Sequence, residues 1–428
     1  MKAVIMAGGK GTRLSSITNN EIPKGMVKVN GISILERQIN LLKRYNINDV
    51  ILIVGHLKDV ITSYFKDGKD FGVNIEYIEE NEPLGTAGAF YYLKSRVQGD
   101  FFLVFGDLIL DMDLTKLVNF HKENDSLLTL VAHPNSHPFD SDLVIENENV
   151  LVKFDSKHNI RNYLYHNLVN SGVYCLNSKV LENIQSVRKI DLEKEFIPSL
   201  LEYKQKVCVY RTSEYIKDVG TLDRLHLAEE DLDKNIVQNK NLSKKQKAIF
   251  LDRDGTINVY KGFINNYKDI ELYDGVSEAI KKINNSDYLV FIISNQPVVA
   301  RGEASIQDVE DMNAYIEMEL GKNGAYIDDI MYCPHHPDKG FEGENVLYKI
   351  KCNCRKPSIG MLEKLAEKYN IDLNKSWVVG DTTMDVMTGI NAGCKTIKLM
   401  CGLQENKFDV EASETVADLK EAINKIIN

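Results

Sequence analysis

Two cysteine and histidine pairs in the last third of the chain have the composition of a metal site. Cys333 and His335 are two residues apart, and Cys352 and Cys354 are two residues apart after a loop rich in glycine and charge. Three thiolates and one imidazole complete a tetrahedral set of ligands for Zn²⁺, the usual composition of a structural zinc site. We therefore expect these four side chains to bind zinc.

Two aspartates, Asp252 and Asp254, directly follow the strand-like run AIFL. Side chains two residues apart on an extended backbone face the same side, so both carboxylates can point into one pocket. One carboxylate can attack phosphorus as a nucleophile, while the other handles the proton of the leaving alcohol. By itself this pair is also compatible with a calcium loop or a turn.

The residues that follow this pair in the chain favour phosphoryl chemistry. The strand-like run 288–293 ends in Ser294, whose hydroxyl can hold phosphoryl oxygens. Lys356 follows the second cysteine pair, and Asp381 and Asp385 follow a later strand. An acid pair, a hydroxyl, a lysine and a second acid pair in this order resemble the four motifs of the haloacid dehalogenase superfamily.

The resemblance to this superfamily implies a phosphatase and assigns roles to its residues. Asp252 would form an aspartyl phosphate, and Asp254 would act as general acid and base. Mg²⁺ would be held by Asp252, Asp381 and the backbone carbonyl of Asp254. Ser294 and Lys356 would stabilise the transferring phosphoryl group, and the acid four residues after Asp381 would place the lysine or a metal-bound water.

The loop that contains the cysteine pairs indicates one family within this superfamily. CPHHP…CNCRKP, DRDGTIN and the segment 300–302 resemble the D-glycero-D-manno-heptose 1,7-bisphosphate phosphatases. This resemblance implies that zinc folds the loop and that Asn295, Arg301 and Arg355 contact the substrate. Histidinol-phosphate phosphatases share the zinc loop, so another small phosphate is an alternative substrate.

The first half begins with a strand-like run, residues 3–7, that ends in the glycine-rich segment GGKGTRL. Glycines let backbone N–H groups approach phosphates, and the cations Arg13 and Lys24 can neutralise them. The small residues of LGTAG allow a flat base to lie against the backbone. The residues expected to bind the nucleotide are Gly8, Gly9, Gly11, Thr12, Leu84, Gly85 and Thr86.

GGKGTRL, PKGMVKV, LGTAGA, GD and DVGT in this order resemble the sugar-1-phosphate nucleotidylyltransferase family over roughly residues 1–235. The resemblance implies that Asp107 and Asp218 hold Mg²⁺ on the nucleotide phosphates. Arg13 and Lys24 would offset charge as a sugar phosphate attacks the α-phosphorus and pyrophosphate leaves. The implied sugar contacts are Lys157, Asn170, Gly172 and Glu193.

Three positions depart from the pattern of this family. Gly25 stands where a second proline is common, and Asp155 stands where a glutamate is usual. Phe105 precedes Gly106, where a small or polar residue is frequent. These departures leave the identity of the sugar open.

Alternating strand and helix patterns must position these residues. Strand-like runs at 49–54 and 101–105 and a helical pattern at 34–45 predict an α/β fold with a mostly parallel sheet. The two resemblances imply two Rossmann-like domains. The first is a mixed, glycosyltransferase-A-like nucleotidyltransferase sheet, and the second is a haloacid dehalogenase-like parallel sheet with a zinc loop.

The composition shifts once along the chain. Residues 229–247 are polar and dense in lysine and asparagine, which is typical of a linker. We therefore expect a nucleotidylyltransferase domain at 1–235, a linker at 236–246 and a phosphatase domain at 247–428.

The bulk composition is that of a globular protein with small-molecule substrates. The chain has 428 residues, a net charge of −10 and interspersed acids and bases, which argues against nucleic acid or a membrane surface as a partner. No secretory signal precedes the first strand, the apolar runs are too short to span a bilayer, and the seven cysteines form no even disulfide framework. These features predict a cytoplasmic protein, with homo-oligomerisation left open.

The two halves together suggest consecutive reactions on one sugar. Removal of the C7 phosphate from D-glycero-D-manno-heptose 1,7-bisphosphate leaves heptose 1-phosphate, which a nucleotidylyltransferase consumes. The first half most resembles the guanylyltransferases of this route to a glycan precursor, so we favour GTP, while ATP, CTP and UTP stay open. Alternatively, the first half acts on another hexose or heptose 1-phosphate, or is only a sugar-phosphate sensor.

Overall fold

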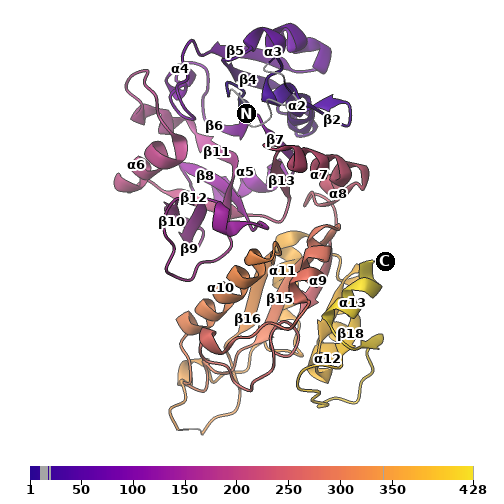
Figure 1. Cartoon of the computed structure of the whole chain (residues 1–428). Helices are drawn as coiled ribbons and strands as arrows, with labels where there is room; N and C mark the ends of the chain where they lie inside the picture. The colour runs from indigo at the N-terminus through magenta and orange to yellow at the C-terminus, as the bar shows by residue number, and fades with distance from the viewer. Residues whose placement is uncertain (10–17, 19–20, 341, 428) are drawn as a thin grey trace. The chain divides into compact units, whose positions relative to one another are not determined.

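The computed structural model of the chain describes residues 1–9, 18, 21–340 and 342–427. Its contacts divide the chain into two compact units, which Figure 1 draws mainly in indigo to magenta and in orange to yellow. The candidate residues Gly11, Thr12 and Arg13 lie outside the described residues. Unit 1 comprises residues 1–133, 142–155 and 170–241, and unit 2 comprises residues 134–141, 156–169 and 242–428.

A nine-stranded mixed sheet forms the centre of unit 1, in the order β5-β4-β1-β6-β11-β8-β12-β10-β9. Strands β5, β4, β1 and β6 are parallel, and β11 is antiparallel to β6. The carboxyl ends of β1 and β6 therefore meet at one edge, where α/β sheets bind ligands. The strands are β1 (Lys2–Met6), β4 (Asp49–Val54), β5 (Asn74–Glu79), β6 (Asp100–Phe105), β8 (Leu128–His133), β9 (Leu143–Asn147), β10 (Val150–Asp155), β11 (Val169–Asn177) and β12 (Val207–Arg211). Two short antiparallel pairs join β2 (Lys28–Val29) to β3 (Ile32–Ser33) and β7 (Leu108–Asp111) to β13 (Tyr215–Asp218).

Helices cover this sheet because their apolar residues recur with helical spacing. In α2 (Ile34–Arg44), Leu35 and Ile39 are buried in the same cluster as Ala3 and Ile5 of β1. The hydroxyl of Ser33 accepts the N–H of the third helical residue and so caps the start of α2. The other helices of unit 1 are α3 (Lys58–Phe65), α4 (Phe90–Leu93), α5 (Leu114–Glu123), α6 (Ile197–Glu202), α7 (Leu222–Asp233) and α8 (Ile236–Asn239).

Unit 2 contains a six-stranded sheet in the order β16-β15-β14-β17-β18-β19, and every neighbouring pair is parallel. The predicted succession of a mixed sheet and a parallel sheet is thus confirmed. The strands are β14 (Lys247–Leu251), β15 (Tyr288–Asn295), β16 (Asp329–Cys333), β17 (Trp377–Gly380), β18 (Lys395–Leu399) and β19 (Glu414–Val416).

The central strand β14 is apolar on both faces, as a covered parallel strand requires. Ile249 and Leu251 pack with residues of α9 (Val276–Asn284), α10 (Ile306–Lys322) and α13 (Leu419–Ile427). Ala248 and Phe250 pack with residues of α11 (Gly360–Tyr369). Because alternate side chains of a strand point to opposite faces, these two groups lie on opposite sides of the sheet. The helix α12 (Thr383–Ala392) follows β17.

The two units do not follow the simple order of the chain. Residues 134–141 follow β8 and residues 156–169 follow β10, yet both segments belong to unit 2 by their contacts. The segment 236–246, expected as a polar linker, contains α8, and Ile236 and Val237 are buried in a core cluster of unit 1. Hydrophobic periodicity does not reveal these features because the segments are short and rich in polar residues.

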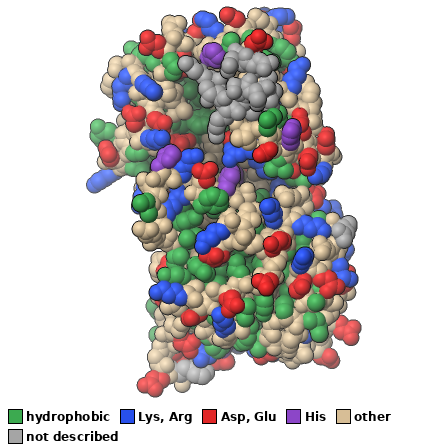
Figure 2. Space-filling model, viewed as in Figure 1, with side chains coloured by type: hydrophobic (Ala, Val, Ile, Leu, Met, Phe, Trp, Pro, Cys, Tyr) green, Lys and Arg blue, Asp and Glu red, His purple; other side chains and the backbone are tan. Residues whose placement is uncertain are grey.

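Acidic and basic side chains are interspersed on the face of the molecule that Figure 2 draws. A nucleic-acid-binding face would instead gather lysine and arginine in a patch or stripe. Among the described helices, none combines the length and the apolar character needed to cross a membrane.

Candidate active sites

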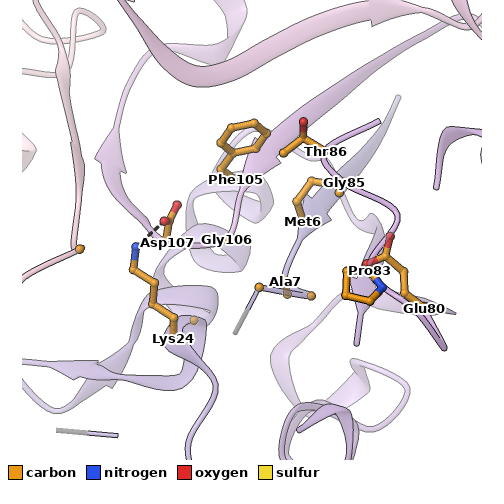
Figure 3. Close-up of a pocket in the computed structure, with 14 residues that line it drawn as sticks. Met6, Ala7, Lys24, Glu80, Pro83, Gly85, Thr86, Phe105, Gly106 and Asp107 are labelled. Atoms are coloured by element: carbon orange, nitrogen blue, oxygen red, sulfur yellow. Dashed lines mark hydrogen bonds and ion pairs between the residues drawn. The ribbon is translucent and has the colours of Figure 1, made fainter. Parts of the chain in front are cut away.

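A cavity of about 420 Å³ lies at the carboxyl ends of β1 and β6 in unit 1 (Figure 3). Ala7 and the residues after it follow β1, while Phe105 ends β6 and Asp107 comes two residues later. Lys24 enters from the short 3-10 helix η2 (Lys24–Met26). The predicted nucleotide-site residues that line the cavity are Gly8, Gly9, Lys24, Gly85, Thr86 and Asp107.

Lys24 and Asp107 form an ion pair in this cavity (Figure 3). Gly25, the residue after Lys24, allows η2 to pack closely against Leu35 and Gly106. A Cβ at Gly25 would lie 2.7 Å from Cγ of Leu35 and 2.9 Å from the carbonyl oxygen of Gly106. The departure from the family pattern at Gly25 therefore lets η2 pack against the residue that precedes the acid.

The second predicted magnesium ligand of unit 1, Asp218, ends strand β13. The N–H of Val219 donates to the carbonyl oxygen of Asp107 over 3.0 Å, so the backbones of the two predicted ligands lie side by side. The carboxylate of Asp218 is paired with Arg224, and that of Asp107 is paired with Lys24. Carboxylates are the ligand type that Mg²⁺ prefers, so the chemistry of both acids suits the predicted ion.

The loop after β5 is held by backbone contacts. Gly85 has a φ of +76°, and a Cβ there would lie 2.4 Å from the carbonyl oxygen of Ile190. The N–H of Ile190 donates to the carbonyl oxygen of Leu84 over 2.9 Å, and the hydroxyl of Thr86 accepts the N–H of Leu192 over 2.7 Å. Only glycine allows this close approach, which fixes the loop as one wall of the cavity.

Glu80 is a cavity residue that our sequence reasoning missed. Its carboxylate accepts the N–H of Leu84, while its Oε1 atom is buried and has no partner among the described residues. Burial raises the pKa of Glu80. A Cβ at Gly8 would lie 2.8 Å from its Oε2 atom, so this glycine makes room for the acid. The available signal was its position directly after a parallel strand.

Two of the predicted sugar contacts form a buried network. Asn170 Nδ2 and the hydroxyl of Tyr174 donate to Oε1 of Glu193 over 2.6 and 2.9 Å, and burial raises the pKa of Glu193. Gly172 has a φ of +80°, and a Cβ there would lie 2.9 Å from the ring of Phe105. The aromatic residue before Gly106 therefore packs against the glycine of this segment.

Lys157 is not grouped with these residues. It belongs to unit 2 by its contacts, and its ammonium lies 3.5 Å from the carboxylate of Asp140. Its assignment to the sugar phosphate thus stays an expectation from the family resemblance.

In unit 2, Asp252, Lys356 and Asp385 form a buried cluster at the carboxyl edge of the parallel sheet. Nζ of Lys356 lies 2.6 Å from Oδ1 of Asp252 and 2.5 Å from Oδ1 of Asp385. Burial raises the pKa of Asp252 to about 8, although Lys356 opposes this. Burial lowers the pKa of Lys356, but the charges of both aspartates outweigh it and raise the pKa. A lysine that stays charged beside a buried acid can offset phosphoryl charge.

Asp252, Asp381 and Asp385 offer carboxylate oxygens that lie within 4.8 Å of one another. Asp381 follows β17, and its Oδ1 atom is buried without a hydrogen-bond partner in the described part of the chain. Burial raises the pKa of Asp381 to about 6. Buried carboxylates that face each other with an unpaired oxygen need a cation, so these residues fit the predicted Mg²⁺.

The carboxylate of Asp254 is fixed by three neighbours. Nη2 of Arg253 and Nε2 of Gln296 each lie 2.9 Å from its Oδ2, and Nδ2 of Asn258 donates to its Oδ1 over 3.0 Å. Burial tends to raise the pKa of Asp254, but Arg253 and these hydrogen bonds outweigh it and lower the pKa. Gln296 also donates to Oγ of Ser294 over 2.7 Å, so this network links two predicted catalytic groups.

The predicted substrate contacts of unit 2 each have a partner within the protein. Asn295 holds the backbone of Lys356, because its Oδ1 accepts the Lys356 N–H over 2.9 Å and its Nδ2 donates to the Lys356 carbonyl over 3.2 Å. Arg355 donates to the carbonyl oxygen of His335 over 3.1 Å. Arg301 forms an ion pair of 2.7 Å with the acid two residues later. Asn295 thus positions the catalytic lysine.

The four predicted zinc ligands come together. The Sγ atoms of Cys333, Cys352 and Cys354 lie 3.2 to 3.5 Å apart, and Nδ1 of His335 lies 3.3 Å from Sγ of Cys354. Zn–S bonds of about 2.3 Å place the corners of a tetrahedron about 3.8 Å apart, which is close to this spacing. The donor set therefore fits a structural zinc ion.

Gly402, in the loop after β18, lies against the carboxylate of Asp381. Substitution of this glycine therefore tests the magnesium site. A Cβ at Gly402 would lie 2.2 Å from Oδ2 of Asp381. Gly402→Ala should therefore displace this carboxylate, lower phosphatase kcat/KM by about 10- to 100-fold and raise the Mg²⁺ concentration needed for half-maximal activity. Gly262→Ala is the control, because Gly262 has a similar φ of +81° and a Cβ there would meet nothing within 4 Å. Equal losses in both variants would point to backbone strain instead.

Comparisons with known proteins match the two halves of the chain to different families. The nucleotidyl transferase family matches residues 2–235, and the HAD-hydrolase-like family matches residues 353–422. The D-glycero-beta-D-manno-heptose-1,7-bisphosphate 7-phosphatase of Haemophilus ducreyi is 35% identical over 184 residues, which cover 43% of this chain and 96% of the relative. Its namesake in Escherichia coli K12 is 33% identical over 190 residues, which cover 43% of this chain and 97% of the relative.

Among solved structures, HddC from Yersinia pseudotuberculosis is 25% identical with a TM-score of 0.47, and the match covers 54% of this chain and 99% of that one. The nucleotidyl transferase match spans more than half of the chain, and the phosphatase relatives are covered almost whole. The chain is therefore a bifunctional enzyme that belongs to the nucleotidyl transferase family through its first half and to the haloacid dehalogenase-type heptose bisphosphate phosphatases through its second half.

Proposed function

We propose that the second half removes the C7 phosphate of D-glycero-D-manno-heptose 1,7-bisphosphate and that the first half couples the resulting heptose 1-phosphate to GTP. The observation that carries the proposal is the pairing of the two families in one chain. The phosphatase relatives are named for the first reaction. Its product has the 1-phosphate that a sugar nucleotidylyltransferase consumes, so one chain performs consecutive steps with sugar phosphates and a nucleotide as its only substrates.

In the phosphatase reaction, Oδ of Asp252 attacks the phosphorus of the C7 phosphate, the bond from phosphorus to the sugar oxygen breaks, and the protonated form of Asp254 gives its proton to that oxygen. Asp254 then takes a proton from the water that cleaves the aspartyl phosphate. Lys356 and Ser294 hold the phosphoryl oxygens. Bound Mg²⁺ supplies further charge neutralisation at Asp252 and Asp381.

In the nucleotidyl transfer, an oxygen of the sugar 1-phosphate attacks the α-phosphorus of the nucleotide, and pyrophosphate leaves. Lys24 and Arg13 offset the charge of the reacting phosphates. Bound Mg²⁺ at Asp107 and Asp218 supplies additional positive charge. The chemistry depends on positioning and charge rather than on a covalent intermediate with the protein.

Glu80 supports guanine as the base. The N1–H and 2-amino groups of guanine are adjacent donors, and one carboxylate can accept from both. Adenine and cytosine place a ring nitrogen with a lone pair at the same edge, and uracil places a single donor between two carbonyl oxygens. Oε1 of Glu80 is buried and has no hydrogen-bond partner in the described part of the chain, so it gains most from a base that presents two donors.

Glu80→Gln should lower kcat/KM for GTP by about 10- to 150-fold, because it removes a charged acceptor from the base edge. The variant should also lose its preference for GTP over ITP, since ITP lacks the 2-amino group. Pyrophosphate release measures both effects. Glu79→Gln is the matched control, because Glu79 pairs with Lys58 at the surface. An unchanged ratio between GTP and ATP in Glu80→Gln would refute this role.

The full reaction is tested by incubating the purified chain with heptose 1,7-bisphosphate, Mg²⁺ and each nucleoside triphosphate in turn. We expect inorganic phosphate in every reaction, and pyrophosphate together with a nucleotide-linked heptose, seen by mass spectrometry, mainly with GTP. Absence of phosphate release would contradict the heptose assignment. Absence of pyrophosphate with all four nucleotides would favour a first half that only senses sugar phosphates.

A further inference from the structure

Gln296 is a buried residue that directly follows β15, at the carboxyl edge of the parallel sheet in unit 2. It is 2% exposed, and its backbone N–H donates to the carbonyl oxygen of Cys333 over 2.8 Å. This bond ties the residue to the end of the neighbouring strand β16. The side-chain amide offers one oxygen acceptor and two N–H donors, and each needs a partner when it is buried.

A charged neighbour fixes the direction in which this amide points. Nη2 of Arg253 donates to Oε1 of Gln296 over 2.9 Å, and Nε2 of Gln296 donates to Oδ2 of Asp254 over 2.9 Å. A guanidinium has only donors and stays charged in proteins. With the amide reversed, its N–H groups would face these donors in a buried place, which is strongly unfavourable. Arg253 therefore selects the observed orientation.

The orientation of the amide determines what the hydroxyl of Ser294 does. Nε2 of Gln296 lies 2.7 Å from Oγ of Ser294, so the nitrogen donates and the hydroxyl oxygen accepts. The proton of the hydroxyl must then point away from the amide. Ser294 is 2% exposed, and no group in the described part of the chain accepts this proton. A buried hydroxyl proton in this position is set to donate to a ligand.

The phosphoryl group that is transferred would supply the missing acceptor. β14 and β15 are parallel neighbours, so Asp252 and Ser294 lie at the same edge of the sheet. Nζ of Lys356 lies 2.6 Å from Oδ1 of Asp252 and donates to the carbonyl oxygen of Ile293 over 3.1 Å. The residue directly before Ser294 thus shares the lysine with the nucleophile. A phosphorus atom attacked by Asp252 brings its oxygens to this place.

We propose that Gln296 is a positioning residue for phosphoryl transfer, because it directs the proton of Ser294 toward the phosphoryl oxygens. The proposal rests on the phosphatase function proposed above and deepens it. Gln296 does not touch the substrate and acts through the hydroxyl. A donor that is aimed before the reaction costs no reorganisation when negative charge develops on those oxygens. Without the amide, the hydroxyl is free to rotate away from them.

Gln296→Met in the full chain tests the proposal, because it keeps the length of the side chain and removes both N–H donors. We expect kcat/KM for heptose 1,7-bisphosphate to fall about ten-fold, against about 100-fold for Ser294→Ala. When Gln296→Met is added to Ser294→Ala, kcat/KM should fall by less than about three-fold more, since the hydroxyl is already absent. Asp254 keeps its bonds to Arg253 and Asn258 in all three variants.

Gln246→Met is the matched control. Gln246 is also buried, with 1% exposure, but it precedes β14 and so lies at the opposite edge of the same sheet. This variant should keep kcat/KM within about two-fold even if its Tm falls. Binding of orthovanadate, an analogue of the transferring phosphoryl group, to the chain with Mg²⁺ gives a readout without turnover. By isothermal titration calorimetry, Kd should rise about ten-fold in Gln296→Met and stay within about two-fold in the control.

Three results would overturn the proposal. One is a further ten-fold loss when Gln296→Met is added to Ser294→Ala, because the amide would then act without the hydroxyl. Another is an unchanged Kd for orthovanadate in Gln296→Met, and the third is an equal loss in both glutamine variants, which a purely structural contact would cause. If the unmodified chain binds orthovanadate but releases no phosphate from heptose 1,7-bisphosphate, the proposed substrate fails instead. The Kd values then still decide the role of Gln296.

Discussion

Asp252→Asn should lower phosphate release from heptose 1,7-bisphosphate by at least about 10⁴-fold, because an amide cannot form the aspartyl phosphate. The effect should be confined to this reaction. Asp252 lies in the buried cluster with Lys356 and Asp385, all within unit 2. Nucleotidyl transfer from supplied heptose 1-phosphate should therefore stay within about two-fold of the unmodified chain. Phosphate and pyrophosphate release, measured separately, distinguish the two reactions.

The reciprocal control is Asp107→Asn, which removes the acid that faces Lys24 in the cavity of unit 1. It should abolish pyrophosphate release and leave phosphatase activity intact. The same substitution in each half thus controls for the loss of a negative charge. If either variant lost both activities without a change in Tm, two independent sites would be contradicted.

Loss of the zinc ion is expected to have the second largest effect. Cys354 lies two residues before Lys356, and Asn295 fixes the backbone of that lysine through two hydrogen bonds. A structural zinc site contributes roughly 10–16 kcal/mol of binding free energy, so its loss unfolds the loop that it holds. Cys354→Ser should therefore lower phosphatase kcat/KM by at least about 100-fold, because Lys356 leaves the position beside Asp252. Nucleotidyl transfer should persist.

The measurements for this prediction are zinc content by elemental analysis, thermal unfolding and both activities. The unmodified chain should contain one zinc per chain, and Cys354→Ser should contain less. Cys394→Ala removes a buried cysteine of the same unit that lies outside the four-ligand group. A Cys354→Ser variant with a full zinc content or full phosphatase activity would refute the coupling between the metal and the lysine.

The sequence was informative wherever a functional residue follows a buried strand. Asp252, Ser294 and Asp381 lie at the carboxyl ends of β14, β15 and β17, and the parallel pairing of these strands brings them to one edge. The runs of apolar residues mark such strands locally and indicate the α/β fold class, whereas the roles of Ser294, Lys356 and Asp381 were implied by a motif order that resembles the haloacid dehalogenase superfamily. The zinc ligands could also be predicted from the local sequence, because the two residues of each pair are only two positions apart.

The remaining features depend on contacts between distant residues that no local pattern records. The burial of Glu80 against Gly8 joins the end of β5 to the loop after β1. The network of Arg253 and Gln296 that orients Asp254 is visible only once β14 and β15 pair. Residues 134–141 and 156–169 are short, polar segments, so their contacts with α10 follow from specific pairs such as His166 and Glu317 rather than from hydrophobic periodicity.

The contact between residues 156–169 and α10 has a consequence for the order in which the protein is made. His166 and Glu317 are 151 residues apart in the chain. At a synthesis rate of about 5–20 residues per second, the ribosome produces residues 156–169 roughly 8 to 30 s before the helix that they contact. These residues therefore remain without the contact until translation has passed α10.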